Sequence, residues 1–132
     1  MKQKKYFKNK IESVQKMIWD LEFKRFKIGE LREEVRQEYD ELKAKRSVLE
    51  AQIKSQKENP TKEAGEIAKL EDQLALLNKD IEKSENDMKG LDLQINGIRP
   101  CADYPEGVTG VNQQLGALRD LTPMIKSYIK TL

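Results

Sequence analysis

The sequence predicts an all-α protein, a long antiparallel coiled-coil helical hairpin with a C-terminal amphipathic helix that packs back on the N-terminal end. Two apolar heptad repeats flank a helix-breaking proline, Pro60, and a shorter amphipathic segment follows them. Charged residues make up 36% of the chain and aromatic residues only 6%, which is typical of a protein that buries a narrow seam. We expect residues 1–99 to form the hairpin and residues 100–132 to form a loop and a C-terminal helical segment.

The first predicted helix spans about residues 3–55 and carries the longer repeat. Its positions recur in alternating steps of four and three, the spacing of a helix that packs along another helix. The repeat consists of Phe7, Ile11, Val14, Ile18, Leu21, Arg25, Ile28, Arg32, Val35, Tyr39, Leu42, Arg46, Leu49 and Ile53. We expect the long stems of the three arginines to cover apolar surface while their heads reach nearby carboxylates. The alternative is a register device or a docking point for an acidic partner.

Residues 56–60 form the predicted turn. Pro60 cannot continue a helix interior but suits the first position of a new helix, with Asn59 or Thr61 as the cap. The second predicted helix, about residues 61–96, carries its own repeat. Its positions are Ile67, Leu70, Leu74, Leu77, Ile81, Ser84, Met88, Leu91, Ile95 and Ile98. A reversal at the proline predicts that the two helices run antiparallel.

Two registers fit this hairpin. The preferred register places Val35 against Ile81, because its loop is then centred near Glu58, next to Pro60. The alternative register is slipped by one heptad and places Val35 beside Met88.

The C-terminal segment is expected to cover the start of the first helix. In the preferred register the second helix ends near Ile18, so that the first three seam residues stay unpaired. A loop over residues 97–110, punctuated by glycine and proline, leads to an amphipathic helix over 111–132. Its apolar residues are Val111, Leu115, Leu118, Leu121, Ile125, Ile129 and Leu132. Thr122-Pro123 would kink or split this helix. We expect it to return along the first helix and form a local three-helix section.

An outward-facing aromatic patch suggests a function. Trp19, Phe23 and Phe26 are spaced four and three on the face nearly opposite the seam, and aromatic residues are frequent interface anchors. The sequence therefore predicts a non-enzymatic coiled-coil protein–protein interaction module, an adaptor, assembly or inhibitor-type protein that binds a protein partner or its own copy. The candidate partner-binding residues are Trp19, Phe23, Phe26, Phe7, Ile11 and Val14.

The alternative function is a nucleic-acid-binding helical arm. It would use the basic N-terminal tip, with Lys4, Lys5, Lys8 and Lys10, and the arginines of the first helix. Such a tip can touch nucleic acid or an anionic surface, but it is more commonly a solubilising helix start. The basic residues are interleaved with acids and no aromatic-plus-basic groove is apparent, so this function is the less favoured one.

Catalytic, cofactor and metal sites are not expected. The chain has no histidine, which removes the common metal and nucleophile arrangements. Acidic pairs such as Glu33-Glu34 and Asp40-Glu41 are interpreted as solvated faces, so we expect neither an enzyme nor a small-molecule ligand. The single cysteine, Cys101, fits a reducing compartment. Neither a membrane span nor a signal peptide is apparent, and the chain is expected to be cytoplasmic and soluble, with export without a signal peptide as the open alternative.

Two stretches of the sequence resemble parts of a known helical arm. The stretch Glu41-Leu42-Lys43-Ala44-Lys45-Arg46-Ser47 and the stretch from Leu91 to Pro100 resemble the first helix and the exit of the antiparallel coiled-coil arm of seryl-tRNA synthetases. The resemblance is architectural and covers residues 34–99. It implies a helical hairpin, and it implies that such an arm can lie against an RNA backbone.

Overall fold

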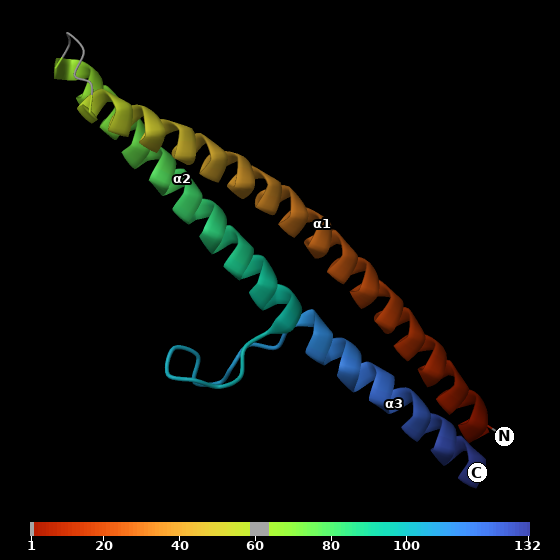
Figure 1. Ribbon diagram of the computed structural model, residues 1–132. Coiled ribbons are helices and arrows are strands. Elements are labelled where there is room, and N and C mark those ends of the chain that lie inside the picture. Colours follow the sequence, from red (N-terminus) through yellow and green to blue (C-terminus); the bar gives the residue numbers. More distant parts are fainter. Residues whose placement is uncertain (1, 59–63) are drawn as a thin grey trace. The chain divides into compact units, whose positions relative to one another are not determined.

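The computed structural model describes residues 2–58 and 64–132, whose secondary structure is three α-helices (Figure 1). They are α1, Lys2–Glu58, α2, Ala64–Asn96, and α3, Val111–Thr131. The all-α fold class is confirmed. Helix α1 continues three residues beyond its predicted end, and residues 59–63, with Pro60 and both predicted caps, lie outside the described residues. No helix in the described part of the chain contains an apolar stretch long enough to cross a membrane.

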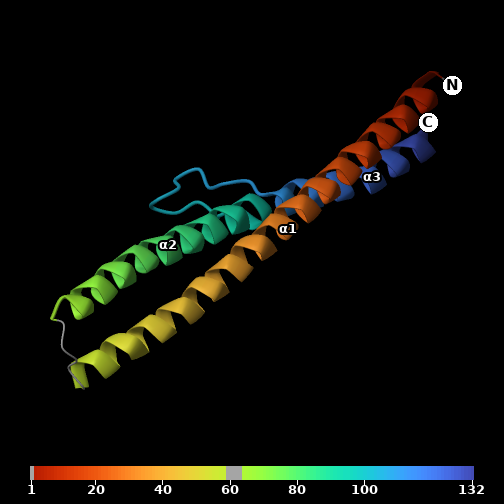
Figure 2. The same cartoon turned by 90° about the horizontal axis from the view of Figure 1, so that it is seen from above.

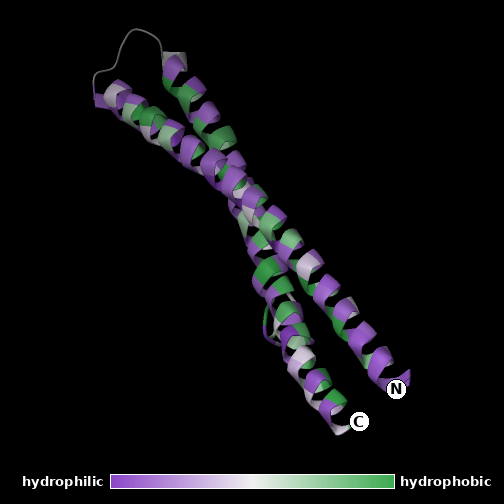
Figure 3. Ribbon diagram, turned by 90° about the vertical axis from the view of Figure 1, so that its right-hand side faces the viewer, coloured by the Kyte–Doolittle hydropathy of each residue, from purple (hydrophilic) through white to green (hydrophobic). Residues whose placement is uncertain are grey.

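Burial along α1 follows the predicted heptad repeat. All fourteen predicted seam positions are buried or half-buried, and every other described residue of α1 except Glu22 and Gln56 is exposed. The most buried seam residues are Val14, Ile28, Leu49 and Ile53, each less than a tenth exposed. Figure 3 shows hydrophobic and hydrophilic residues alternating along the helices, as such a narrow seam requires.

The chain divides into two compact units, which share α1. Residues 31–90 form one, here called the central unit, and residues 1–30 together with 91–132 form the other, the terminal unit.

In the central unit, the contact between Tyr39 and α2 distinguishes the two registers. The Tyr39 hydroxyl donates a hydrogen bond of 3.1 Å to Glu85. The preferred register would place Tyr39 opposite Leu77, and Glu85 would then lie about 12 Å further along α2. The alternative register places Tyr39 beside Ser84, next to Glu85 in sequence. The preferred register was therefore wrong by one heptad.

Flanking charges give a physical reason for this register. Lys57 Nζ lies 3.4 Å from a carboxylate oxygen of Glu71, which directly follows the seam position Leu70. In the preferred register Glu50, one heptad before Lys57, would take its place beside Glu71. Like charges facing each other across a helix pair are unfavourable, and such flanking residues commonly set helix alignment. The pairing of late α1 residues with early α2 residues is the order of antiparallel helices.

In the terminal unit, α3 contacts the first part of α1. The Phe7 and Tyr128 rings meet edge to face at 5.0 Å between centroids, and Arg119 forms an ion pair of 2.7 Å with Glu22. Early residues of α1 thus pair with late residues of α3, so these helices also run in opposite directions. Figures 1 and 2 show the start of α1 and the end of α3 side by side.

Helix α2 reaches less far toward the N-terminal end of α1 than the sequence predicted. Asn96, its last residue, accepts a 3.0 Å hydrogen bond from the Asn112 side chain. The Asn112 oxygen accepts a 3.0 Å bond from Arg25. The end of α2 therefore lies beside Arg25, seven residues further along α1 than the predicted Ile18. The prediction of a local three-helix section was wrong for the same reason as the preferred register, because α2 ends one heptad short of the predicted position along α1. Within the terminal unit the described part of α2 is only residues 91–96, and α3 takes over from it along α1.

Two glycines close the loop that joins α2 to α3. A Cβ on Gly110 would overlap the Gly97 nitrogen and lie 2.6 Å from the Ile95 carbonyl oxygen. Gly97 has a φ of 66°, a left-handed conformation that glycine adopts without a steric cost. Ile98 and Val108 exchange two backbone hydrogen bonds of 2.9 and 2.8 Å. The loop therefore leaves and returns at one point of the fold.

Gln113 joins the two helix ends at this point. Its side-chain oxygen accepts a 2.7 Å hydrogen bond from the backbone N–H of Gly110, the residue before α3. Its amide nitrogen donates to the carbonyl oxygen of Asn96, at the end of α2. Terminal N–H and C=O groups have no partner inside their own helix, so one side chain satisfies a terminal group of each helix.

The loop removes residues without breaking the heptad repeat. After Leu91 and Ile95 the α2 repeat would place Ile98 in the seam, but Ile98 is 37% exposed. Val111 and Leu115 are 2% and 1% exposed and continue the same alternation of three and four steps. The intervening residues, 98–110, are looped out, so that α3 resumes the repeat of α2 in phase.

Helix α3 passes through Pro123 as one helix. Two apolar residues of the predicted amphipathic helix, Leu121 and Leu132, are exposed, at 38% and 41%. Thr122 is half-buried instead, since alternating steps from Leu118 reach residue 122 rather than 121. The Thr122 hydroxyl donates a 3.4 Å hydrogen bond to the Leu118 carbonyl oxygen.

The register of the central unit can be tested by paired cysteines. With Cys101 replaced by serine, cysteines at Val35 and Met88 should crosslink efficiently within one chain under a short thiol-specific crosslinker. Cysteines at Val35 and Ile81 are the matched control and should crosslink poorly. Gel mobility of the dilute protein measures both. Efficient crosslinking of the control pair alone would restore the register that the sequence favoured.

The close approach of Gly97 and Gly110 can be tested by two substitutions with opposite expected effects on the free energy of unfolding. Gly110→Ala should destabilise the protein by about 1–3 kcal/mol, because the added methyl group overpacks against the backbone. Gly116→Ala lies in the interior of α3 with no atom near its Cβ, and should stabilise by about 1 kcal/mol through helix propensity. Urea denaturation followed by circular dichroism measures both. Equal effects of the two changes would show that the junction is not tight.

Candidate interaction surface

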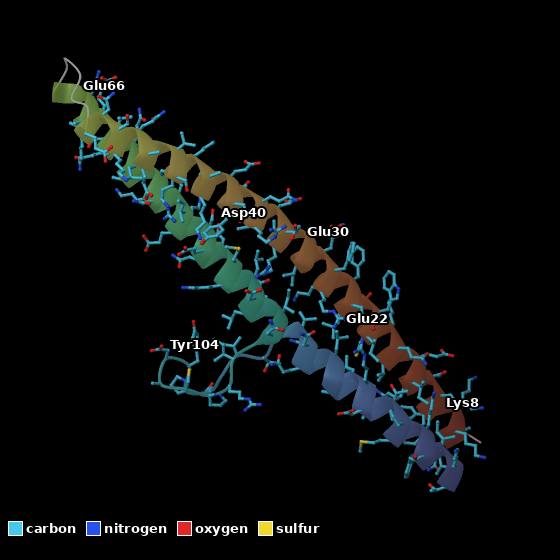
Figure 4. All side chains as sticks on the ribbon, viewed as in Figure 1. Lys8, Glu22, Glu30, Asp40, Glu66 and Tyr104 are labelled. Carbon is cyan, nitrogen blue, oxygen red and sulfur yellow. The ribbon has the colours of Figure 1, made fainter. Side chains whose placement is uncertain are left out.

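Three aromatic side chains form an exposed face on α1 in the terminal unit, here called the aromatic face. Trp19, Phe23 and Phe26 are 64%, 52% and 59% exposed, although the chain has only one tryptophan and three phenylalanines. The Trp19 and Phe23 rings are stacked, with centroids 5.8 Å apart and planes 7° from parallel. Figure 4 shows ring side chains projecting from this part of α1, between the labelled Glu22 and Glu30. The sequence prediction that these rings point outward therefore agrees with their exposure.

Charged residues lie at the edge of the aromatic face. Lys27 Nζ lies 5.4 Å from the centroid of the Phe23 ring and 3.6 Å from a carboxylate oxygen of Glu30. On the other side, Glu22 is engaged by Arg119 of α3. A cation over an aromatic ring is attracted to its negative face. The face is thus an apolar patch with charged residues at its edge, which is the usual composition of a protein-binding patch.

The other three candidate residues lie against α3. Val14 is 6% exposed, and Phe7 and Ile11 are half-buried. The Phe7 ring also contacts both Tyr6, at 5.2 Å, and Tyr128, at 5.0 Å between centroids. These three side chains are less accessible to a partner than Trp19, Phe23 and Phe26.

The lysines of the alternative nucleic-acid function lie exposed on the first turns of α1. Lys4, Lys5, Lys8 and Lys10 are all exposed, and Lys10 Nζ lies 5.5 Å from the centroid of the Tyr6 ring.

Two of the seam arginines have polar partners within the protein, and only one of these partners is a carboxylate, the group that was expected from the sequence. Arg25 reaches Asn112. Arg46, the other of these two arginines, lies 3.9 Å from a carboxylate oxygen of Glu50.

One residue of each acidic pair, Glu33 and Asp40, belongs to an exposed cluster within α1 in the central unit. Arg36 Nε donates a 3.0 Å bond to Glu33, and Arg36 Nη1 donates a 2.9 Å bond to Asp40. The hydrogen bond from Arg36 is the main reason why the pKa of the Glu33 carboxyl is lowered from its ordinary value. The hydrogen bond to Glu33 likewise raises the pKa of Arg36.

Sequence reasoning missed two further exposed apolar regions. In the central unit, Val48 and Leu76 are 60% and 63% exposed, and Val48 lines an open groove with Leu49 and Leu77. In the terminal unit, Met124 is 67% exposed beside the exposed Tyr128. The sequence did contain a signal for this exposure, because Val48, Leu76, Met124 and Tyr128 all fall outside the seam positions of the heptad repeats.

Comparison with models of known protein families, with curated proteins and with solved structures gave no match to this chain. The aromatic face and the exposed lysines are features of the described residues from which a function can be argued.

Proposed function

We propose that this chain is a non-enzymatic protein–protein interaction module, built as an antiparallel coiled coil whose C-terminal helix packs back on its N-terminal end. The aromatic face is its docking surface. The observation that carries this proposal is the exposure of Trp19, Phe23 and Phe26, each more than half exposed. The heptad seam of the same helix is occupied by the chain's own helices, which leaves the aromatic face available.

The physical argument rests on the cost of leaving such side chains in water. Transfer of a large apolar side chain from water to an interface contributes roughly 1.5–3 kcal/mol, and tryptophan is among the residues that most commonly dominate binding energy. The stacked rings of Trp19 and Phe23 are already ordered against each other, so these side chains lose less conformational entropy when a partner binds. The partner is a protein with an apolar surface, or a second copy of the chain.

Changing Trp19 and Phe23 together to serine tests this surface. The double variant should lose partner binding or self-association while its helicity and melting temperature stay nearly unchanged, because both rings are exposed. Sedimentation of the purified chain measures self-association. A pull-down from the source cell, with and without nuclease, measures capture of a partner and separates protein partners from nucleic acid.

Two control variants sharpen this experiment. Val48→Ser with Leu76→Ser removes a comparable exposed apolar pair from the central unit and should leave binding intact. Leu115→Ala removes a buried side chain and should cost about 2–5 kcal/mol of stability, which gives the signature of a core change. Loss of binding in the Val48/Leu76 variant, with binding retained in the Trp19/Phe23 variant, would move the docking surface to the central unit. Melting of the Trp19/Phe23 variant would show that the aromatic face is part of the core.

A further inference from the structure

The tip of the terminal unit concentrates positive charge. It consists of residues 2–11 of α1 and residues 121–132 of α3 and its C-cap, and is here called the basic tip. It holds seven lysines and neither an acidic residue nor an arginine. All seven are exposed: Lys2, Lys4, Lys5, Lys8, Lys10, Lys126 and Lys130. The sequence alone showed only the α1 part of this cluster.

Aromatic contacts bring the two halves of the basic tip together. Phe7 of α1 meets Tyr128 of α3 edge to face, and its other neighbour is the Tyr6 ring. Lys10 Nζ lies over the Tyr6 ring at 5.5 Å. A row of three rings therefore crosses from one helix to the other, with the lysines of both helices around it. In Figure 4, Lys8 is labelled at this end of the terminal unit.

Exposed apolar side chains accompany the lysines. Met124, Tyr6 and Tyr128 are 67%, 55% and 51% exposed. Met124 and Tyr128 line an open depression with Pro123 on the outer side of α3. A surface with exposed apolar side chains next to lysines, and without acidic residues, has the composition of surfaces that lie at a membrane interface.

We propose that the basic tip binds the surface of an anionic lipid bilayer. Each lysine near such a surface is attracted by its negative potential, which strengthens binding roughly fivefold. Tyrosine is enriched at the level of lipid headgroups because its ring is apolar and its hydroxyl is polar. Met124 would insert between the headgroups, where its thioether leaves water.

The side-chain composition favours lipid over nucleic acid as the occupant. Arginine, whose planar fork matches phosphate in two hydrogen bonds, is absent from the basic tip. Lysine acts as a point charge and suits a diffuse anionic surface. An exposed methionine has no partner on a phosphate backbone, but it gains free energy in a bilayer interface. The basic tip is separate from the aromatic face, so this proposal does not depend on the proposed function.

Vesicle co-sedimentation of the full chain tests the proposal. The chain should bind vesicles of phosphatidylcholine with about 30% phosphatidylserine, a composition with a negative surface potential, and should not bind vesicles of phosphatidylcholine alone. Replacement of Lys4, Lys5, Lys8 and Lys126 by glutamine should weaken binding at least about a hundredfold. Met124→Ser should weaken it roughly tenfold by removing the inserted side chain.

Matched controls separate the tip from overall charge. Replacement of four exposed central lysines, Lys54, Lys69, Lys79 and Lys83, by glutamine changes the net charge equally and should leave vesicle binding within about twofold, since these residues are outside the basic tip. The Trp19/Phe23 double variant should bind vesicles as well as the unchanged chain does, which distinguishes this proposal from the proposed function.

Three outcomes would overturn the proposal. They are no sedimentation with the phosphatidylserine vesicles, equal loss in the tip and control lysine variants, and equal binding to vesicles without phosphatidylserine. A fourth would replace lipid by nucleic acid. In that case a duplex DNA or RNA oligonucleotide binds more tightly than the vesicles, the tip lysine variant loses this binding, and Met124→Ser leaves both vesicle and oligonucleotide binding unchanged.

Discussion

The apolar seam of α1 extends from Phe7 to Ile53, and neither of the other two helices is long enough to cover it alone. In the central unit α2 lies along the seam, and in the terminal unit α3 does. The exchange between them depends on the close approach of Gly97 and Gly110, whose backbones leave no room for a Cβ. The loop can then leave and return without breaking the heptad repeat. A side chain at Gly110 would overlap the Gly97 nitrogen and the Ile95 carbonyl oxygen and would force the loop ends apart.

The junction between α2 and α3 also shows how a polar residue is accommodated in the narrow apolar seam of α1. Arg25 occupies a seam position, where an apolar residue would be expected, but it lies at the point where α2 ends and α3 begins. Its guanidinium donates to Asn112, which donates to Asn96. The seam arginine therefore coincides with the exposed ends of two helices, where terminal carbonyl and amide groups need polar partners.

The sequence was sufficient for the fold class, the fourteen seam positions of α1 and the exposure of the aromatic face, because all three follow from helical periodicity. It was insufficient for the register, because a shift of seven residues keeps every apolar position in the seam. The information that distinguishes the registers lay in flanking residues such as Lys57, Glu50 and Glu71, where the favoured register would have paired two carboxylates. The same error placed the end of α2 at Ile18 rather than Arg25. Periodicity also could not show that the lysines of α3 lie beside those of α1, because that depends on which helix ends meet.

Exposed large apolar residues are concentrated in the terminal unit. Among the described residues, eleven of the fourteen exposed large hydrophobic side chains belong to it, and only Leu31, Val48 and Leu76 belong to the central unit. The terminal unit also carries thirteen basic and eight acidic residues, whereas the central unit carries twelve and fifteen. A helix pair needs only its seam to be apolar, so the central unit is close to the minimum that pairing requires. The aromatic face lies outside the seam, whereas the exposed Tyr128 ring contacts Phe7 and so takes part in the pairing of α1 with α3. The aromatic face and the basic tip are the parts of the terminal unit's surface on which the two proposals rest.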